Sequence, residues 1–96
     1  MTIQDIQEDA RRLAPIFGDK TPERRMLYLA TEFGEFSREV LRVVQGSQEA
    51  DKENLGMEIY DIIWNMCDLA NMLDVDLADC FEKKREQNKT RWPHLR

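Results

Sequence analysis

The sequence predicts an all-α protein whose four helices form a bundle. Apolar residues recur every three or four positions along most of the chain, and no stretch alternates apolar and polar residues as a half-buried strand does. Residues that cap or break helices divide the chain into four segments with short connections. The 96 residues are the size of one domain, so we expect a single domain over residues 1–96.

The first two predicted helices have clear start signals. Thr2, with an aspartate three residues later, can cap a helix over residues 3–17. A Gly-Asp-Lys break follows, and then Thr21 precedes a proline, which is the usual order of a helix cap and a first helical residue. Gly46 is expected to end this second helix, because glycine readily takes the backbone conformation that closes one.

The last two helices are separated by an aspartate-rich break. Residues 47–51 form a polar connection, and the third helix is expected to run to about residue 73. Asp76 can cap a fourth helix that continues to about Arg91. Pro93 then stops it, because proline cannot continue a helix.

The third helix is apolar on two sides when wound at about 100° per residue. One side carries Leu55, Ile59, Ile62, Ile63, Met66, Leu69, Ala70 and Leu73. Nearly opposite lie Met57, Tyr60, Trp64 and Cys67, and one polar stripe consists of Glu58, Asp61, Asn65 and Asp68. A single chain of short helices can cover only one apolar side, so we expect the side around Trp64 to bind a partner. The polar stripe of such a buried helix needs partners or a metal ion.

Two pairs of carboxylates lie at matching positions on the second and third helices. The pair Glu32 and Glu35 and the pair Glu58 and Asp61 are equally far from the turn near residue 46. In an antiparallel hairpin they come level and converge across one groove. Carboxylates so close on one helix repel unless water screens them or a cation lies among them. Oxygen ligands suit Mg²⁺ or Mn²⁺, so we expect a metal site there, with solvated surface as the alternative.

These two acidic pairs, 22 residues apart, resemble the signature of the MazG-like all-α nucleoside triphosphate pyrophosphohydrolases. The stretch before the first pair is also similar to that family. Further similar positions lie in the last helix and the tail: Lys84, Asn88, Arg91, Trp92 and Pro93.

The resemblance implies an enzyme that cleaves a nucleoside triphosphate between the α- and β-phosphates, releasing a nucleoside monophosphate and pyrophosphate in nucleotide-pool housekeeping. It implies that Glu32, Glu35, Glu58 and Asp61 hold Mg²⁺, with Mn²⁺ able to substitute, and carry the catalysis. It further implies a homodimer or a dimer of dimers that completes the bundle, with active sites near the subunit interface.

The resemblance also makes the last helix a candidate substrate-binding element. Lys84, Asn88 and Arg91 share one face, where two cations and an amide can hold phosphate oxygens and a sugar or base. A solvated, positively charged helix end is the alternative. Trp92 either stacks on a base or closes the bundle. Gln7 on the first helix is a weaker candidate for reaching the nucleotide.

The charge distribution limits the partners. The net charge is −5, but residues 81–96 carry +4 and the remaining residues −9. Binding to a nucleic-acid polymer is not expected, since that function needs a basic face across the domain. No apolar run approaches the roughly 20 residues of a membrane span, so no membrane association is expected and we expect a cytoplasmic protein.

Two other functions fit the same residues. A phosphoribosyl-ATP pyrophosphohydrolase shares the fold and the acidic motifs. A small helical interaction protein could instead use the acidic stripe to bind a basic partner. Dependence on Mg²⁺ separates the enzymes from the interaction protein.

Overall fold

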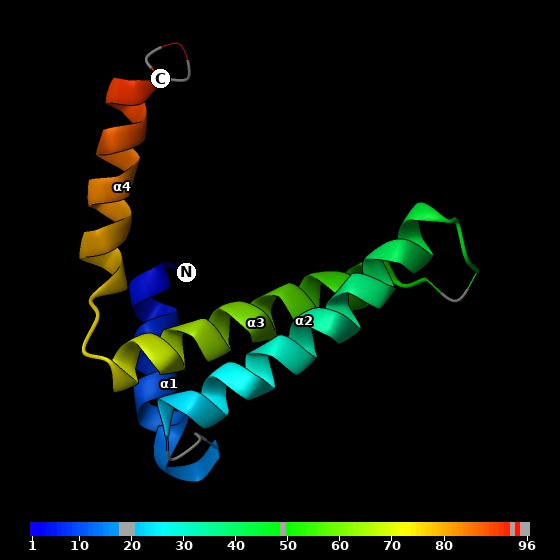
Figure 1. Ribbon diagram of the computed structural model, residues 1–96, viewed down its shortest axis with the longest axis horizontal. Helices are drawn as coiled ribbons and strands as arrows, with labels where there is room; N and C mark the ends of the chain where they lie inside the picture. The colour runs from blue at the N-terminus through cyan, green and yellow to red at the C-terminus, as the bar shows by residue number, and fades with distance from the viewer. Residues whose placement is uncertain (18–20, 49, 93, 95–96) are drawn as a thin grey trace.

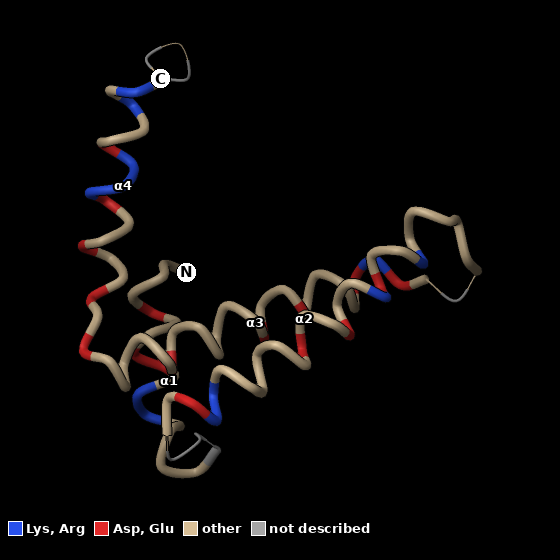
Figure 2. Tube along the Cα trace, in the orientation of Figure 1, with Lys and Arg blue, Asp and Glu red and all other residues tan. Residues whose placement is uncertain are grey.

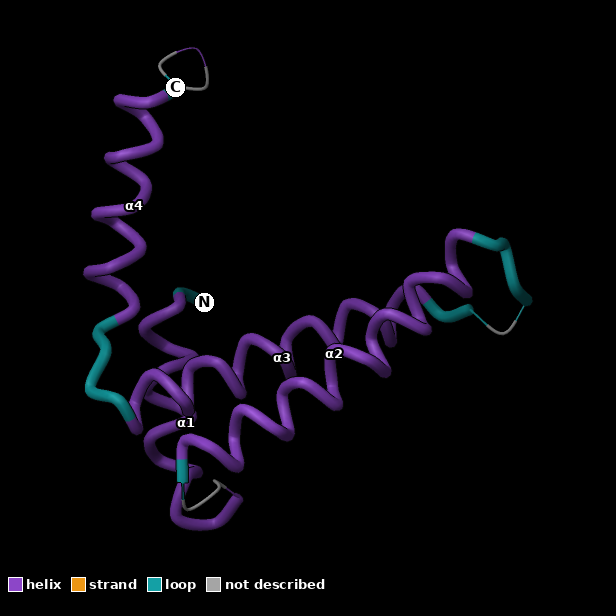
Figure 3. The backbone as a smooth tube through the Cα atoms, in the orientation of Figure 1, coloured by secondary structure: helices purple, strands orange, loops and turns teal. Residues whose placement is uncertain are grey.

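The computed structural model describes residues 1–17, 21–48, 50–92 and 94, and this part of the chain contains helices but no strand (Figures 1 and 3). The four helices are α1 (Ile3–Phe17), α2 (Pro22–Val44), α3 (Lys52–Met72) and α4 (Leu77–Arg91). The all-α prediction is confirmed. The helix boundaries follow the capping residues closely, because caps act locally.

The predicted caps are present in the structure. The backbone N–H of Asp5 donates to Thr2 Oγ1 at 3.1 Å, and the Thr2 N–H donates to Asp5 Oδ2 at 2.8 Å. These two bonds form a capping box and hold the pKa of Asp5 below its usual range. Thr21 and Asp76 each accept a bond from the backbone N–H three residues later, at 3.2 and 3.1 Å.

Gly46 lies at the turn that follows α2, where its φ of 70° is the left-handed conformation that glycine adopts without strain. Its N–H donates to the carbonyl of Val43 at 3.1 Å. This confirms the predicted end of the helix. The predicted break at residues 18–20 and the stop at Pro93 fall outside the residues that the structure describes.

The centre of the molecule is an antiparallel hairpin of α2 and α3, with α1 packed against the end of α3 near the α4 connection (Figure 1). The core under α1 is small and consists of Ile6, Ala10 and Cys67, surrounded by Ile3, Tyr60, Ile63, Trp64 and Leu77. The buried side chain of Gln7 anchors α1, because its Nε2 donates to Val75 O at 2.6 Å and its Oε1 accepts from the Leu77 N–H at 3.2 Å. Gln7 therefore links α1 to the α3–α4 turn, and both ends of its amide are bound to backbone groups.

The side of α3 that was expected to bind a partner is largely covered within the chain. Tyr60, Trp64 and Cys67 pack under α1, and Cys67 is fully buried. Only Met57 of that predicted side stays exposed. The expectation was wrong because the sequence shows two apolar sides on α3 but does not show which of them α1 covers.

The opposite side of the hairpin is the one that remains open. Large apolar side chains with 43–56% exposure lie there at intervals of seven residues on each helix. We call them the apolar flank: Met26 and Phe33 of α2, Ile59 and Met66 of α3, and Leu73 directly after α3. Seven residues are nearly two helical turns, so the side chains of each helix form one continuous stripe.

The helix α4 extends away from the hairpin and packs mainly against α1 (Figure 1). The chain measures 43 × 41 × 24 Å, and its radius of gyration is 15.9 Å, whereas a compact domain of this length has about 12.5 Å. Lys and Arg gather toward the C-terminal half of α4 (Figure 2). A single chain therefore supplies four helices without closing them into a bundle, and closure by dimerisation stays a prediction.

No helix among the described residues is both long enough and apolar enough to span a bilayer.

Candidate active site

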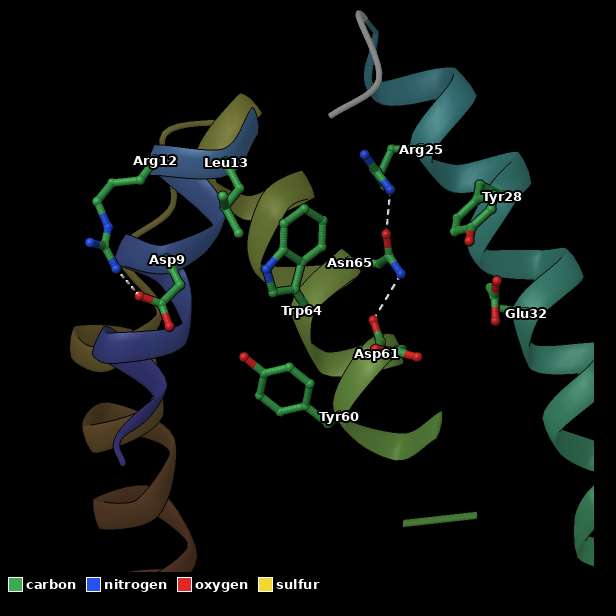
Figure 4. A pocket seen from close by; sticks show the side chains of 10 residues that line it. All are labelled: Asp9, Arg12, Leu13, Arg25, Tyr28, Glu32, Tyr60, Asp61, Trp64 and Asn65. Atoms are coloured by element: carbon green, nitrogen blue, oxygen red, sulfur yellow. Dashed lines mark hydrogen bonds and ion pairs between the residues drawn. The ribbon is translucent and has the colours of Figure 1, made fainter. Parts of the chain in front are cut away.

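A groove of about 880 Å³ lies between α1, α2 and α3. Figure 4 shows side chains from all three helices pointing toward it. Its lining residues are Asp9, Arg12 and Leu13 of α1, Arg25, Tyr28 and Glu32 of α2, and Tyr60, Asp61, Trp64 and Asn65 of α3. Carboxylates, aromatic rings and guanidinium groups thus share one cavity large enough for a small ligand.

Two of the predicted metal ligands meet in this groove. Glu32 of α2 and Asp61 of α3 both line it, as their equal distance from the hairpin turn requires. A hydrogen bond to the Glu32 carboxylate and partial burial raise the pKa of Tyr28, and the negative charges of Glu32 and Asp61 add to this. The phenol of Tyr28 therefore stays protonated next to Glu32.

Glu58 lies one helical turn before Asp61 on α3 and has a buried oxygen, but it does not line the groove. Its Oε1 accepts from Asn54 Nδ2 at 3.1 Å. Its Oε2 is buried and has no hydrogen-bond partner in the part of the chain that the structure describes. A buried carboxylate oxygen without a partner is costly unless another group binds it. This atom fits a cation ligand.

The fourth predicted ligand, Glu35, is exposed on α2 and does not line the groove. Within residues 1–17, 21–48, 50–92 and 94, no three His, Cys, Asp or Glu side chains are close enough together to hold a metal ion. The donor set is of the oxygen type that Mg²⁺ prefers, and its side chains would have to close around the ion.

A buried ion pair lies beside Asp61 and was not foreseen from the sequence. Arg25 is 3% and Asp68 1% exposed, and Arg25 Nη2 lies 2.8 Å from Asp68 Oδ2. Arg25 Nη1 also donates to Asn65 Oδ1. The guanidinium carbon is 5.6 Å from the centre of the Tyr28 ring and 5.8 Å from that of Trp64. Asn65 and Asp68 of the polar stripe thus have Arg25 as their partner.

The predicted substrate-binding residues of α4 lie away from this groove in the single chain. Lys84 and Asn88 line a separate cavity of about 860 Å³ between α4 and the start of α1. Arg91 is exposed on α4, with its guanidinium carbon 5.6 Å from the centre of the half-exposed Trp92 ring. The structure therefore does not bring the α4 residues to the carboxylates within one copy of the chain.

Residues 20–96 match the model of the MazG nucleotide pyrophosphohydrolase domain. The chain belongs to this family. The match covers α2, α3 and α4, and so includes the acidic pairs and the basic residues of the last helix. Neither curated proteins nor solved structures gave a significant match to the chain. Membership of the MazG family supports the hypothesis of an enzyme over that of an interaction protein.

Some lining residues of the groove were not predicted from the sequence. Those from α1 could not be placed, because nothing local shows against which side of α3 this helix packs. Arg25 could have been found: it precedes Glu32 by seven residues as Asp68 follows Asp61 by seven, so the hairpin that makes the two carboxylates level also pairs Arg25 with Asp68.

Proposed function

We propose that this protein hydrolyses nucleoside or deoxynucleoside triphosphates between the α- and β-phosphates and releases a nucleoside monophosphate and pyrophosphate. The observation that carries the proposal is the groove, in which carboxylates of α2 and α3 face one another beside three aromatic rings. The MazG family match supports the reaction type. Removal of surplus or unwanted nucleotides is the cellular role that we propose.

We propose Mg²⁺ as the cofactor, with Mn²⁺ able to substitute. Glu32, Glu58 and Asp61 would hold it, together with Glu35 once its exposed side chain turns inward. Bound there, the ion would offset the charge of the triphosphate and activate the attacking water. The carboxylates bind and orient, and none of them needs to attack phosphorus itself.

The aromatic rings of the groove offer a place for the base. Tyr28, Tyr60 and Trp64 lie on the walls next to the carboxylates. A base has an apolar face that stacks favourably on aromatic side chains. The proposed pose has the phosphates at Glu32 and Asp61 and the base against these rings.

Cations for the phosphates have to come from outside this groove. Arg12 already binds Asp9, and Arg25 binds Asn65 and Asp68. The helix α4 and the Trp92 that follows it carry the substrate-binding residues that we propose: Lys84, Asn88, Arg91 and Trp92. Because α4 points away from its own groove, we propose that it serves the groove of a second copy.

A homodimer, or a dimer of dimers, is therefore part of the proposal. The apolar flank supplies a self-complementary surface, because two copies of a helix hairpin can pack their stripes into a four-helix bundle. The radius of gyration is larger than that of a compact domain of this length, because α4 extends from the hairpin. This agrees with our proposal that α4 packs on a second copy.

The test is ³¹P NMR of the protein with each common nucleoside and deoxynucleoside triphosphate, with Mg²⁺ or with EDTA. We expect monophosphate and pyrophosphate only with Mg²⁺, and no products with the variant Glu58→Gln. Orthophosphate would mean cleavage of a different bond. Turnover of phosphoribosyl-ATP alone would favour a phosphoribosyl-ATP pyrophosphohydrolase, and no turnover of any nucleotide would favour the interaction protein.

Sharing of the site between subunits has its own test. Lys84→Ala and Glu58→Gln should each lack activity, since each removes a different half of every site. Mixing the two variants, with subunit exchange, should restore part of the activity, because one site of each mixed dimer then receives both intact halves. No recovery after confirmed exchange would place both halves in the same chain.

A further inference from the structure

The buried ion pair Arg25–Asp68 lies at a place where stability alone does not require it. Removing two charges from water costs several kcal/mol, and apolar residues of similar volume are often equally stabilising. The pair is nevertheless almost completely buried, between α2 and α3 and one wall of the groove. Its position next to the candidate metal ligands suggests a role in the site.

Arg25 reaches the Asp61 turn of α3 through Asn65. The Asn65 amide accepts from Arg25 with Oδ1 and donates from Nδ2 to the backbone carbonyl of Asp61 at 2.8 Å. Because both ends of the amide are bound, its orientation is determined by Arg25. Figure 4 shows this chain of contacts running from Arg25 to Asp61.

On its own helix, Arg25 also contacts the side chain next to Glu32. Its guanidinium packs against the ring of Tyr28, with 5.6 Å between the guanidinium carbon and the ring centre. The ring of Tyr28 lines the groove next to Glu32, which follows it by one helical turn. One buried cation thus packs, on α2, against the ring next to Glu32 and is joined, on α3, through Asn65 to the backbone of Asp61.

We propose that Arg25, held by Asp68, is a positioning residue that keeps Glu32 and Asp61 oriented toward a shared divalent cation. The inference rests on the proposed function, in which these two carboxylates are ligands. Two carboxylates on different helices repel when the ion is absent. A rigid support behind each of them lowers the reorganisation that the ion must impose, and such supports usually change metal affinity or activity 10–100-fold when they are lost.

The test is Mn²⁺ binding to the full chain without nucleotide, followed by the loss of the free-ion signal in electron paramagnetic resonance. The main variant is the double substitution Arg25→Met with Asp68→Leu, which removes both buried charges together and should leave the fold intact. Asn65→Leu is a second variant, which keeps both charges of the ion pair and removes the amide that joins Arg25 to Asp61. For each we expect a Kd for Mn²⁺ that is raised about tenfold or more.

The matched control is Asn71→Leu. Asn71 is on the same helix as Asn65, and its Nδ2 likewise donates to a backbone carbonyl, that of Gln7 at 2.9 Å. It lies outside the groove. An effect caused by a generally loosened α3 would appear in this control too, whereas an effect on positioning would not.

Activity adds a second readout. In the double variant the Mg²⁺ concentration for half-maximal activation should rise, while kcat at saturating Mg²⁺ should change much less. Circular dichroism and thermal melting of each variant establish that it is folded.

The outcomes separate this inference from the proposed function. No Mn²⁺ binding by the unsubstituted protein would overturn both. Wild-type binding that is lost in Glu58→Gln, together with an unchanged Kd in the double variant and in Asn65→Leu, would overturn the positioning role alone. An equal loss in Asn71→Leu would also overturn it.

Discussion

The two sides of the α2–α3 hairpin are made from the same helices but differ in chemistry. The groove side gathers Glu32, Asp61 and the buried Arg25–Asp68 pair, and α1 walls it. The apolar flank on the other side carries large exposed side chains with no charge among them. Nothing in the propensity of the two helices requires this division. The difference agrees with our proposals that the groove binds a nucleotide and that the apolar flank binds a second copy of the chain.

Loss of a metal ligand should have the largest effect on the groove side. Replacing Glu58 by Gln removes a charged oxygen donor but keeps the size of the side chain. We expect turnover to fall by more than about 100-fold, since removing a ligand costs at least as much as removing its support. The measurement is the rate of pyrophosphate release, and circular dichroism should show an unchanged helix content. Wild-type rates would remove Glu58 from the mechanism.

Breaking the buried ion pair on one side only should affect stability next. Arg25→Met leaves the Asp68 carboxylate buried without its cation, which we expect to lower the free energy of unfolding by about 3–5 kcal/mol. Adding Asp68→Leu should restore most of it. Urea denaturation followed by circular dichroism measures both. Equal destabilisation by the single and double variants would mean that the charges do not depend on each other.

A charge on the apolar flank should weaken the dimer. Met66→Glu places a carboxylate in the expected interface, and loss of a central interface residue costs about 2 kcal/mol or more, roughly a 30-fold rise in Kd. Light scattering at micromolar concentration should show the variant as a monomer and the unsubstituted protein as a dimer or larger.

The matched control for the flank is Leu27→Glu. Leu27 is even more exposed but is turned about 100° from Met26, off the stripe. It should leave the mass unchanged. An unsubstituted protein that is itself monomeric would contradict the whole interpretation of the flank.

The smallest expected effect concerns the wall that α1 forms. Burial under α1 raises the pKa of the Cys67 thiol, so this thiol stays protonated and shielded. A thiol reagent should label the exposed Cys80 at once and Cys67 only as fast as α1 detaches. The labelling rate of Cys67 thus measures how often the groove opens, and rapid labelling of both thiols would show that α1 is not docked.

The same burial gives a dependence of stability on pH. The folded state keeps the Cys67 thiol protonated, whereas in the unfolded state it ionises near pH 8.5. The unfolded state therefore binds fewer protons, and the free energy of unfolding falls as the pH rises above this value. Cys67→Ala should remove this part of the dependence, which denaturation at pH 7 and pH 9.5 would detect.

The ends of the helices could be predicted from the sequence alone. Thr2, Thr21, Gly46 and Asp76 set the ends of helices, because a cap depends only on residues within one turn. The pairing of Glu32 with Asp61 could also be predicted, because two antiparallel helices joined by a short turn have only one register at a fixed rise per residue.

Two features could not be predicted from the sequence: which apolar side of α3 is covered, and the direction in which α4 extends. Both sides of α3 can bury a similar apolar area, so the choice depends on where α1 packs, and Gln7 anchors α1 through bonds to residues almost 70 positions away. Such contacts leave no periodic signal in the sequence. The pairing of Arg25 with Asp68 follows from the register of the hairpin, but its burial does not, because a charged residue looks solvated until the fold covers it.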